Sequence, residues 1–152
     1  MSKRIRYNLL ENMFISFIIT FAAGTFCYEE HMPESFMNFF RPAILAVCIC
    51  TWIYIAFFSG VRNKWGFEIF AVIFWLAPQL IIYLAESGPE VCRMSITMYL
   101  LSEFFTIMFA APAGQMGGLL KIDAFPCIII TVLMCTFAFL VGNLLFRPSQ
   151  KR

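Results

Sequence analysis

The chain has 152 residues, of which 61% are hydrophobic and 13% are charged, and its formal net charge is +2. A soluble domain contains about 25% charged and about 45–50% apolar residues, and no soluble domain of this size could bury the 19 Phe residues of this chain. The composition therefore excludes a soluble globular protein and predicts a single all-α integral membrane domain over residues 1–152.

The first predicted element is a membrane helix over residues 9–28. The basic residues Lys3, Arg4 and Arg6 precede it, as in a secretory signal peptide. The apolar run continues to Tyr28, however, and more hydrophobic spans follow it. We therefore expect an uncleaved first span.

The segment after the first span is acidic and holds the only histidine of the chain. Its candidate residues are Glu29, Glu30, His31 and Glu34. Histidine and carboxylates can bind a divalent cation, but the spacing fits no zinc motif. We expect a solvated acidic loop on the outer side, with no metal and no cofactor.

The second and third spans are predicted over residues 43–60 and 67–84. Arg41 and Pro42 introduce the second span, and a proline is tolerated at a helix start because its missing N–H needs no partner there. Only the short segment 61–66 separates the two spans. This spacing predicts an antiparallel pair of helices.

The third span carries two polar residues of interest. Gln79 follows Pro78, and its amide can hydrogen-bond to another helix within the membrane. Glu68 lies near the inner end, where we expect a local ion pair with Arg62 or Lys64.

The fourth element, residues 95–113, is a helix with features that argue against a complete crossing. It carries Glu103, and a carboxylate in the middle of a span is unfavourable. Tyr99, Glu103 and Thr106 recur at helical spacing and form a candidate polar or pore-lining stripe. Pro112 and the following glycines predict that the helix breaks into a turn. We expect a re-entrant or interfacial helix and a Gly-rich turn over residues 95–123 on the outer side, with a fifth span as the alternative.

The last span is predicted over residues 125–146. Gly142 allows a neighbouring helix to approach closely, and Asn143 can hydrogen-bond between helices near the inner surface. Cys27, Cys92 and Cys127 lie near span ends, where one pair can form a disulfide if that side is oxidising. Six free thiols are the simpler expectation.

The basic residues predict the topology through the positive-inside rule. With four spans and both termini cytoplasmic, eight of the eleven Lys and Arg residues lie on the inner side. These eight are Lys3, Arg4, Arg6, Arg62, Lys64, Arg147, Lys151 and Arg152. A fifth span divides the eleven into six inside and five outside, which leaves almost no bias. The charges therefore favour four spans in a bacterial inner membrane.

Three function classes fit this layout. The chain has no metalloprotease, hydrolase or phosphate-binding signature, so we expect no enzyme activity. We expect a self-associating membrane subunit that senses the membrane or docks a cytosolic protein partner, without binding nucleic acid directly. The alternatives are a small oligomeric channel or transporter and an immunity-type membrane protein.

The layout of the chain also resembles a known family. The basic start "MSKRIRYNLL", four apolar spans, short loops and the basic end "RPSQKR" are similar to the small inner-membrane subunits (the KwaA family) of bacterial Kiwa anti-phage defence systems. The resemblance implies an oligomeric membrane sensor that detects phage attack and works with a cytosolic DNA-binding partner. It covers the layout and no residue motif, so it assigns no site residue.

Overall fold

The structure is a computed structural model that describes residues 8–28, 34–87 and 95–146. All of the regular structure in these ranges is helical. The helices are α1 (Leu9–Tyr28), α2 (Glu34–Val61), α3 (Trp65–Ser87), α5 (Ile96–Phe105), the π-helix η1 (Thr106–Ala110), α6 (Ala111–Leu120) and α7 (Ala124–Phe146).

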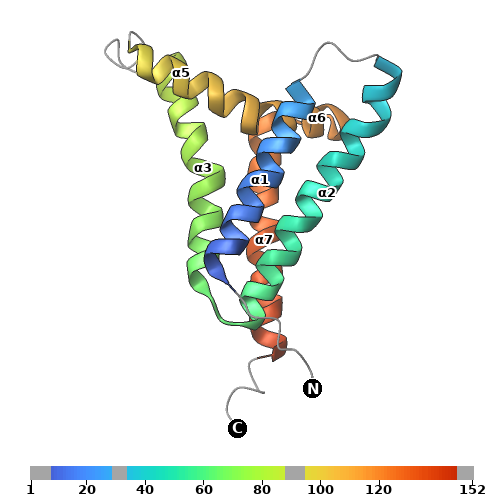
Figure 1. Cartoon of the computed structure of the whole chain (residues 1–152), viewed down its shortest axis with the longest axis vertical. Helices are drawn as coiled ribbons and strands as arrows, with labels where there is room; N and C mark the ends of the chain where they lie inside the picture. Colours follow the sequence, from blue (N-terminus) through green and yellow to red (C-terminus); the bar gives the residue numbers. More distant parts are fainter. Residues whose placement is uncertain (1–7, 29–33, 88–94, 147–152) are drawn as a thin grey trace.

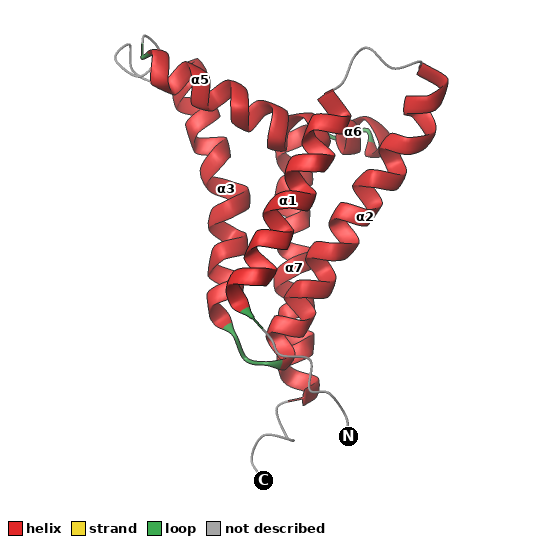
Figure 2. Ribbon diagram, in the orientation of Figure 1, coloured by secondary structure: helices red, strands yellow, loops and turns green. Residues whose placement is uncertain are grey.

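Four of the helices run along the length of a wedge-shaped molecule (Figure 1). We call the end with the α2–α3 connection the narrow end, and the opposite end the wide end. α1 begins and α7 ends at the narrow end. α3 ends and α7 begins at the wide end, and α5, η1 and α6 lie obliquely across that end between them (Figure 2).

The predicted class of helical membrane protein is confirmed. Five helices of the described residues are long and apolar enough to cross a membrane, which matches the five-span alternative by length and composition. These helices are Leu9–Tyr28, Phe39–Val61, Trp65–Ser87, Ile96–Gly118 and Ala124–Phe146. In the fold, however, the fourth of them begins and ends at the wide end, whereas the other four connect the two ends (Figure 1).

α2 and α7 form the most closely packed pair, and glycine makes this packing possible. A Cβ on Gly60 of α2 would overlap the backbone carbonyl of Phe139, and a Cβ on Gly142 of α7 would overlap that of Phe57. Small residues at helix interfaces let membrane helices pack backbone to backbone. The prediction that Gly142 permits close approach is therefore confirmed. Asn143 also makes a hydrogen bond outside its own helix, because it donates to the side chain of Asn63 in the α2–α3 connection at 2.8 Å.

An aromatic cluster around Trp52 joins α2 to α1 and α3. The Trp52 side chain is fully buried, and its ring lies 5.2–6.0 Å from the rings of the α3 residues Phe67, Phe70, Phe74 and Trp75. Its indole N–H donates to the Thr20 hydroxyl of α1 at 2.9 Å. That hydroxyl in turn donates to the Ser16 carbonyl at 2.8 Å, so the Trp52 N–H and the Thr20 hydroxyl both have partners, whereas the buried Ser16 hydroxyl has none among the described residues.

The prediction of a broken helix after Pro112 is wrong, because residues 96–120 are helical throughout. Pro112 is the second residue of α6, which directly follows η1. A proline is tolerated there because neighbouring helices and a local π adjustment can satisfy the freed backbone groups. The glycines continue the helix to Leu120, where Lys121 ends it in the left-handed conformation (φ 58°).

η1 is also the segment that attaches this element to the bundle. A Cβ on Gly24 of α1 would lie 2.7 Å from the Ile107 carbonyl oxygen and 2.7 Å from Met108 Cα. Met108 and Phe109 of η1 are buried. Gly24 therefore allows α1 and the π-helix to touch through their backbones.

The second helix starts earlier than the sequence suggested. α2 begins at Glu34, so Pro42 lies inside the helix and not at its start. A proline inside a helix removes one backbone hydrogen bond and bends the helix. α2 does change direction in its wide-end part (Figure 2). The predicted span over residues 43–60 therefore covers only the most apolar part of α2.

Candidate functional site

The candidate site is a row of polar side chains on the face of α3 that meets α7. Glu68, Trp75 and Gln79 are separated by seven and four residues, so they recur on one face of a helix with 3.6 residues per turn. Each of the three has a buried polar atom without a hydrogen-bond partner: Glu68 Oε2, Trp75 Nε1 and Gln79 Nε2. We call this row the α3–α7 seam. Unsatisfied buried groups are uncommon, so these three atoms are candidates for contact with a water molecule, a ligand or a second chain.

Glu68 is the buried carboxyl of the seam. Only 6% of the residue is exposed. The Thr136 hydroxyl of α7 donates to Glu68 Oε1 at 2.5 Å, whereas Oε2 has no partner. An ionisable group inside a membrane bundle is a functional candidate by default, because its burial is unfavourable.

The expected ion pair between Glu68 and Arg62 or Lys64 is wrong. Both basic side chains are exposed in the connection before α3, and no ion pair of Glu68 is found among the described residues. The helical phase explains the difference. Glu68 is the fourth residue of α3, and its position in the first turn directs it toward α7, where Thr136 donates to it.

Trp75 lies at the centre of the seam, beside a small cavity. The cavity has a volume of about 10 Å³, and Trp75, Thr131 and Thr20 are among its lining residues. The Thr131 hydroxyl donates to the Cys127 carbonyl at 2.9 Å within its own helix. A cavity of this size is at the lower limit for one water molecule.

Gln79 lies where the seam opens into a groove. This groove has a volume of about 570 Å³ and is lined by α3 and by Phe125 of α7. Gln79, Tyr83 and Glu86 recur along its α3 wall at helical spacing. Tyr83 is 61% exposed and Glu86 is exposed, so the polar wall faces outward from the single chain.

The other predicted polar stripe lies on α5, away from the seam. Tyr99 and Glu103 are exposed, and Thr106 is partly buried at the start of η1. The Ser102 hydroxyl donates to the Tyr99 carbonyl at 2.8 Å within the helix. The stripe therefore points out of the chain, at the wide end.

Most of the predicted charged surface lies outside the described residues. This holds for Glu29, Glu30 and His31, and for the basic residues Lys3, Arg4, Arg6, Arg147, Lys151 and Arg152. Glu34 is the first residue of α2. Cys27 and Cys127 are free thiols and do not form a disulfide with each other, while Cys92 is outside the described ranges.

Sequence reasoning found Gln79 but missed its partners in the seam. In the sequence, Trp75 does not stand out among the many aromatic residues of its span, and Thr136 does not stand out in the last span. The helical spacing of Glu68, Trp75 and Gln79 could have revealed the shared face. That Thr136 and Thr131 oppose this face depends on how α7 packs, which no local pattern encodes.

Together these features define a multi-pass helical membrane protein with a polar seam inside its bundle. Comparison with known protein families, curated sequences and solved structures finds no match. The functional argument therefore depends on the geometry of this chain.

Proposed function

We propose that the protein is a non-enzymatic membrane subunit that self-associates in the bilayer through the groove between α3 and α7. The observation that carries this proposal is the Gln79 amide. It lies in the middle of a membrane helix, at the wall of an open groove, and its nitrogen has no hydrogen-bond partner.

A second copy of the chain can satisfy this amide. In a two-fold symmetric dimer the same patch is used by both copies, so Gln79 of one chain faces Gln79 of the other. A half-turn of one of the two terminal amides exchanges its oxygen and nitrogen, and that side chain then donates to the amide oxygen of its partner. Hydrogen bonds between membrane helices contribute about 0.6–2 kcal/mol each.

The surroundings of Gln79 favour the same surface. Leu80 and Tyr83 of α3 are exposed beside it, and so is Phe125 on the opposite wall. Large side chains around a central polar pair give a helix interface both packing and orientation. Gln79 thus supplies a central hydrogen-bonding group to a patch that the large side chains of Leu80, Tyr83 and Phe125 surround.

The test is the oligomeric state of the purified protein by native mass spectrometry in mild detergent. The wild type is expected as a defined oligomer, and Gln79→Leu is expected to shift it toward monomers. Gln115→Leu is the matched control, because Gln115 lies on α6 outside the groove. A monomeric wild type, or equal oligomers from all three proteins, would contradict the proposal.

A partner-docking sensor is the role that we propose for this assembly. Exposed Arg62 and Lys64 lie at the narrow end (Figure 1). In our proposal this end faces the cytoplasm of a bacterial cell, because the positive-inside rule favours basic residues on that side. The layout that resembles Kiwa membrane subunits supports a cytosolic partner and a role in anti-phage defence. An affinity pull-down tests this step, and a stoichiometric cytosolic protein that is lost with Arg62→Glu/Lys64→Glu would support it.

A small oligomeric channel is the second candidate, and the seam is the observation that favours it. Glu68 lies near the narrow end, and Gln79 and Glu86 follow along the same face toward the wide end. A buried carboxyl group such as Glu68 can take part in a proton relay through a bundle when water connects it to the next carboxylate. Proton flux into liposomes that Glu68→Gln abolishes would favour the channel, while an oligomer without flux favours the scaffold.

A further inference from the structure

The small cavity beside Trp75 lies at the centre of the bundle, where the α3–α7 seam meets the other helices. Residues of α1, α2, α3, α6 and α7 line it. Trp75 is the eleventh of the 23 residues of α3 and therefore lies at the middle of a membrane span. Bulk water is absent at this depth, so a polar group there needs a partner inside the bundle.

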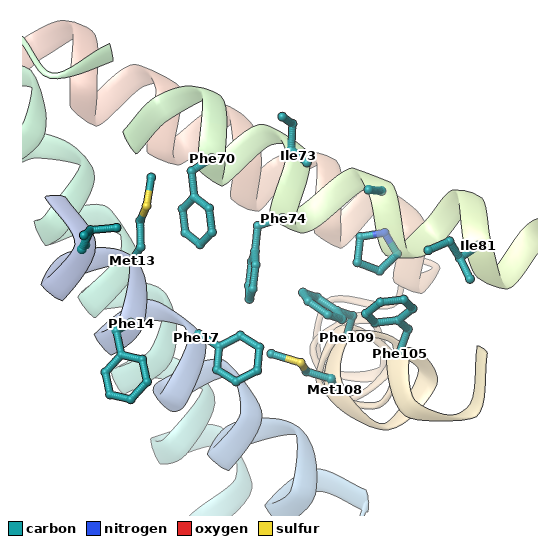
Figure 3. Close-up of a pocket in the computed structure, with 13 residues that line it drawn as sticks. Met13, Phe14, Phe17, Phe70, Ile73, Phe74, Ile81, Phe105, Met108 and Phe109 are labelled. Atoms are coloured by element: carbon teal, nitrogen blue, oxygen red, sulfur yellow. The ribbon is translucent and has the colours of Figure 1, made fainter. Parts of the chain in front are cut away.

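The indole N–H of Trp75 is a buried donor that its aromatic neighbours do not satisfy. Trp75 is 5% exposed, and its Nε1 atom has no hydrogen-bond partner among the described residues. The rings of Trp52, Phe74 and Phe109 lie 5.5–6.1 Å from the Trp75 ring. Phe74 and Phe109 meet each other between α3 and η1 (Figure 3). A ring face is only a weak acceptor, so these contacts do not replace an oxygen atom.

Two hydroxyl oxygens on the cavity wall have acceptor positions for a further hydrogen bond. The Thr131 hydroxyl donates its hydrogen to a carbonyl of its own helix at 2.9 Å. The Thr20 hydroxyl also donates to a carbonyl of its own helix, and it accepts one hydrogen bond from Trp52. A hydroxyl oxygen can accept two hydrogen bonds. Both oxygens therefore need a donor, whereas the Trp75 N–H needs an acceptor.

We propose that this cavity binds one water molecule, which accepts from the Trp75 N–H and donates to the hydroxyl oxygens of Thr131 and Thr20. Its volume of about 10 Å³ just admits one water molecule and excludes a lipid chain or a side chain of a second copy. A cavity lined by hydrocarbon alone stays dry, but these three side chains supply the two to four polar partners that a buried water needs.

A metal ion fits the cavity less well than water does. Among the described residues, no group of three or more His, Cys, Asp or Glu side chains is placed to hold one. Cys48 and Cys127 line the cavity, and a buried cysteine in an apolar run behaves as a small hydrophobic residue. The neutral donor and acceptors around the cavity match a neutral ligand.

The bound water would join three helices at the middle of the seam. Trp75 belongs to α3, Thr131 to α7 and Thr20 to α1. Nearer the narrow end, Thr136 and Glu68 join α7 and α3 through a direct hydrogen bond. The water site is built within one chain, so it does not depend on self-association through Gln79.

The experiment is nuclear magnetic resonance of the full chain in micelles, with ¹⁵N-labelled tryptophan. The loss of one indole signal in Trp75→Phe assigns the Trp75 N–H. In the wild type we expect a rotating-frame Overhauser cross-peak between this proton and water. Ala113→Val fills the cavity from α6 and is expected to remove the cross-peak. Ala111→Val, on the same helix outside the cavity, is expected to retain it.

Two results would overturn the proposal. A wild type without the cross-peak has a dry cavity. A cross-peak that survives in Ala113→Val comes from exchanging hydroxyl groups, because this variant keeps both threonines.

If Ala113→Val does not fold, Thr131→Val decides. It keeps the shape of the side chain but removes an acceptor of the water. We therefore expect the Trp75 indole proton signal to move upfield as its hydrogen bond weakens. Thr136→Val, outside the cavity, is the control and is expected to leave this signal in place. Equal Trp75 signals in the two threonine variants would overturn the proposal.

Discussion

The contact between Glu68 and Thr136 makes a sharp quantitative prediction. Thr136→Val keeps the shape of the side chain but removes the hydroxyl that donates to Glu68 Oε1. Glu68 is 6% exposed and Oε2 has no partner. The substitution therefore removes the one hydrogen bond found for this carboxyl among the described residues.

The expected loss follows from the burial of the carboxyl. A buried acceptor without its donor costs about 1–3 kcal/mol, so the free energy of unfolding falls by that amount. Glu68→Met removes the carboxyl itself, and the Thr136 hydroxyl can then bond the backbone carbonyl four residues earlier. We expect Glu68→Met to cost less than Thr136→Val, and the double variant to be no less stable than Thr136→Val alone.

The assay is unfolding by sodium dodecyl sulfate in mixed micelles, followed by tryptophan fluorescence. The four proteins of the cycle give the coupling between the two residues directly. A stability of Thr136→Val equal to that of the wild type, or strictly additive losses in the double variant, would refute the reasoning that the seam contains a buried, singly bonded carboxyl.

Three further predictions concern the packing and the topology. Gly24→Ala places a Cβ against the backbone of η1 and is expected to destabilise the protein by about 1–3 kcal/mol. In the control Gly114→Ala the new Cβ meets nothing within 4 Å, so this variant is expected to be neutral or to be more stable by up to about 1 kcal/mol. Equal unfolding curves for the two variants would contradict the close contact between α1 and η1. Trp52→Phe loses the hydrogen bond to Thr20 and is expected to lower the free energy of unfolding by about 1 kcal/mol for that bond, as measured by thermal unfolding. If the double variant Thr20→Val/Trp52→Phe is less stable than Trp52→Phe alone, the two residues are not coupled. In a cysteine-free background, Ser87→Cys and Lys121→Cys are expected to react with an impermeant maleimide that is added on one side of the membrane. Lys64→Cys is expected to react only when the maleimide is added on the other side. Labelling of Lys64→Cys and Lys121→Cys from the same side would require a fifth crossing.

The sequence predicted the membrane helices well where hydropathy alone decides. The first span was expected over residues 9–28, and α1 is Leu9–Tyr28. The last span was placed within one residue of the start of α7. In these segments the apolar residues dominate and the one charged residue, Glu11, lies in the first turn of α1, so a composition window locates the helix.

The errors arose where backbone geometry decides. Pro112 and its glycines are usual signs of a helix end, yet the π-helix before them and the contact of Gly24 with it hold residues 96–120 in one helical element. Pro42 likewise lies inside α2. Whether a proline ends a helix or bends it depends on the neighbouring helices, which a local pattern does not contain.

The site was only partly predictable for a similar reason. Gln79 was a candidate because an amide in a membrane span is conspicuous in any sequence. Glu68 was expected to pair with basic neighbours in the chain, but its rotation on α3 directs it to α7. The polar partners of a membrane helix are set by packing across the bundle, and only the three-dimensional structure shows them.

Self-association through Gln79 is the central claim, and energy transfer in lipid vesicles tests it most directly. Donor-labelled and acceptor-labelled chains are reconstituted together, and the transfer efficiency is followed as the protein is diluted with lipid. The account predicts transfer that persists on dilution for the wild type and for Gln115→Leu. For Gln79→Leu it predicts an apparent dissociation constant that is roughly tenfold larger, as the loss of one hydrogen bond of about 1.4 kcal/mol implies. Transfer that falls with dilution as it does for randomly distributed monomers, or that is the same in Gln79→Leu as in the wild type, would contradict it.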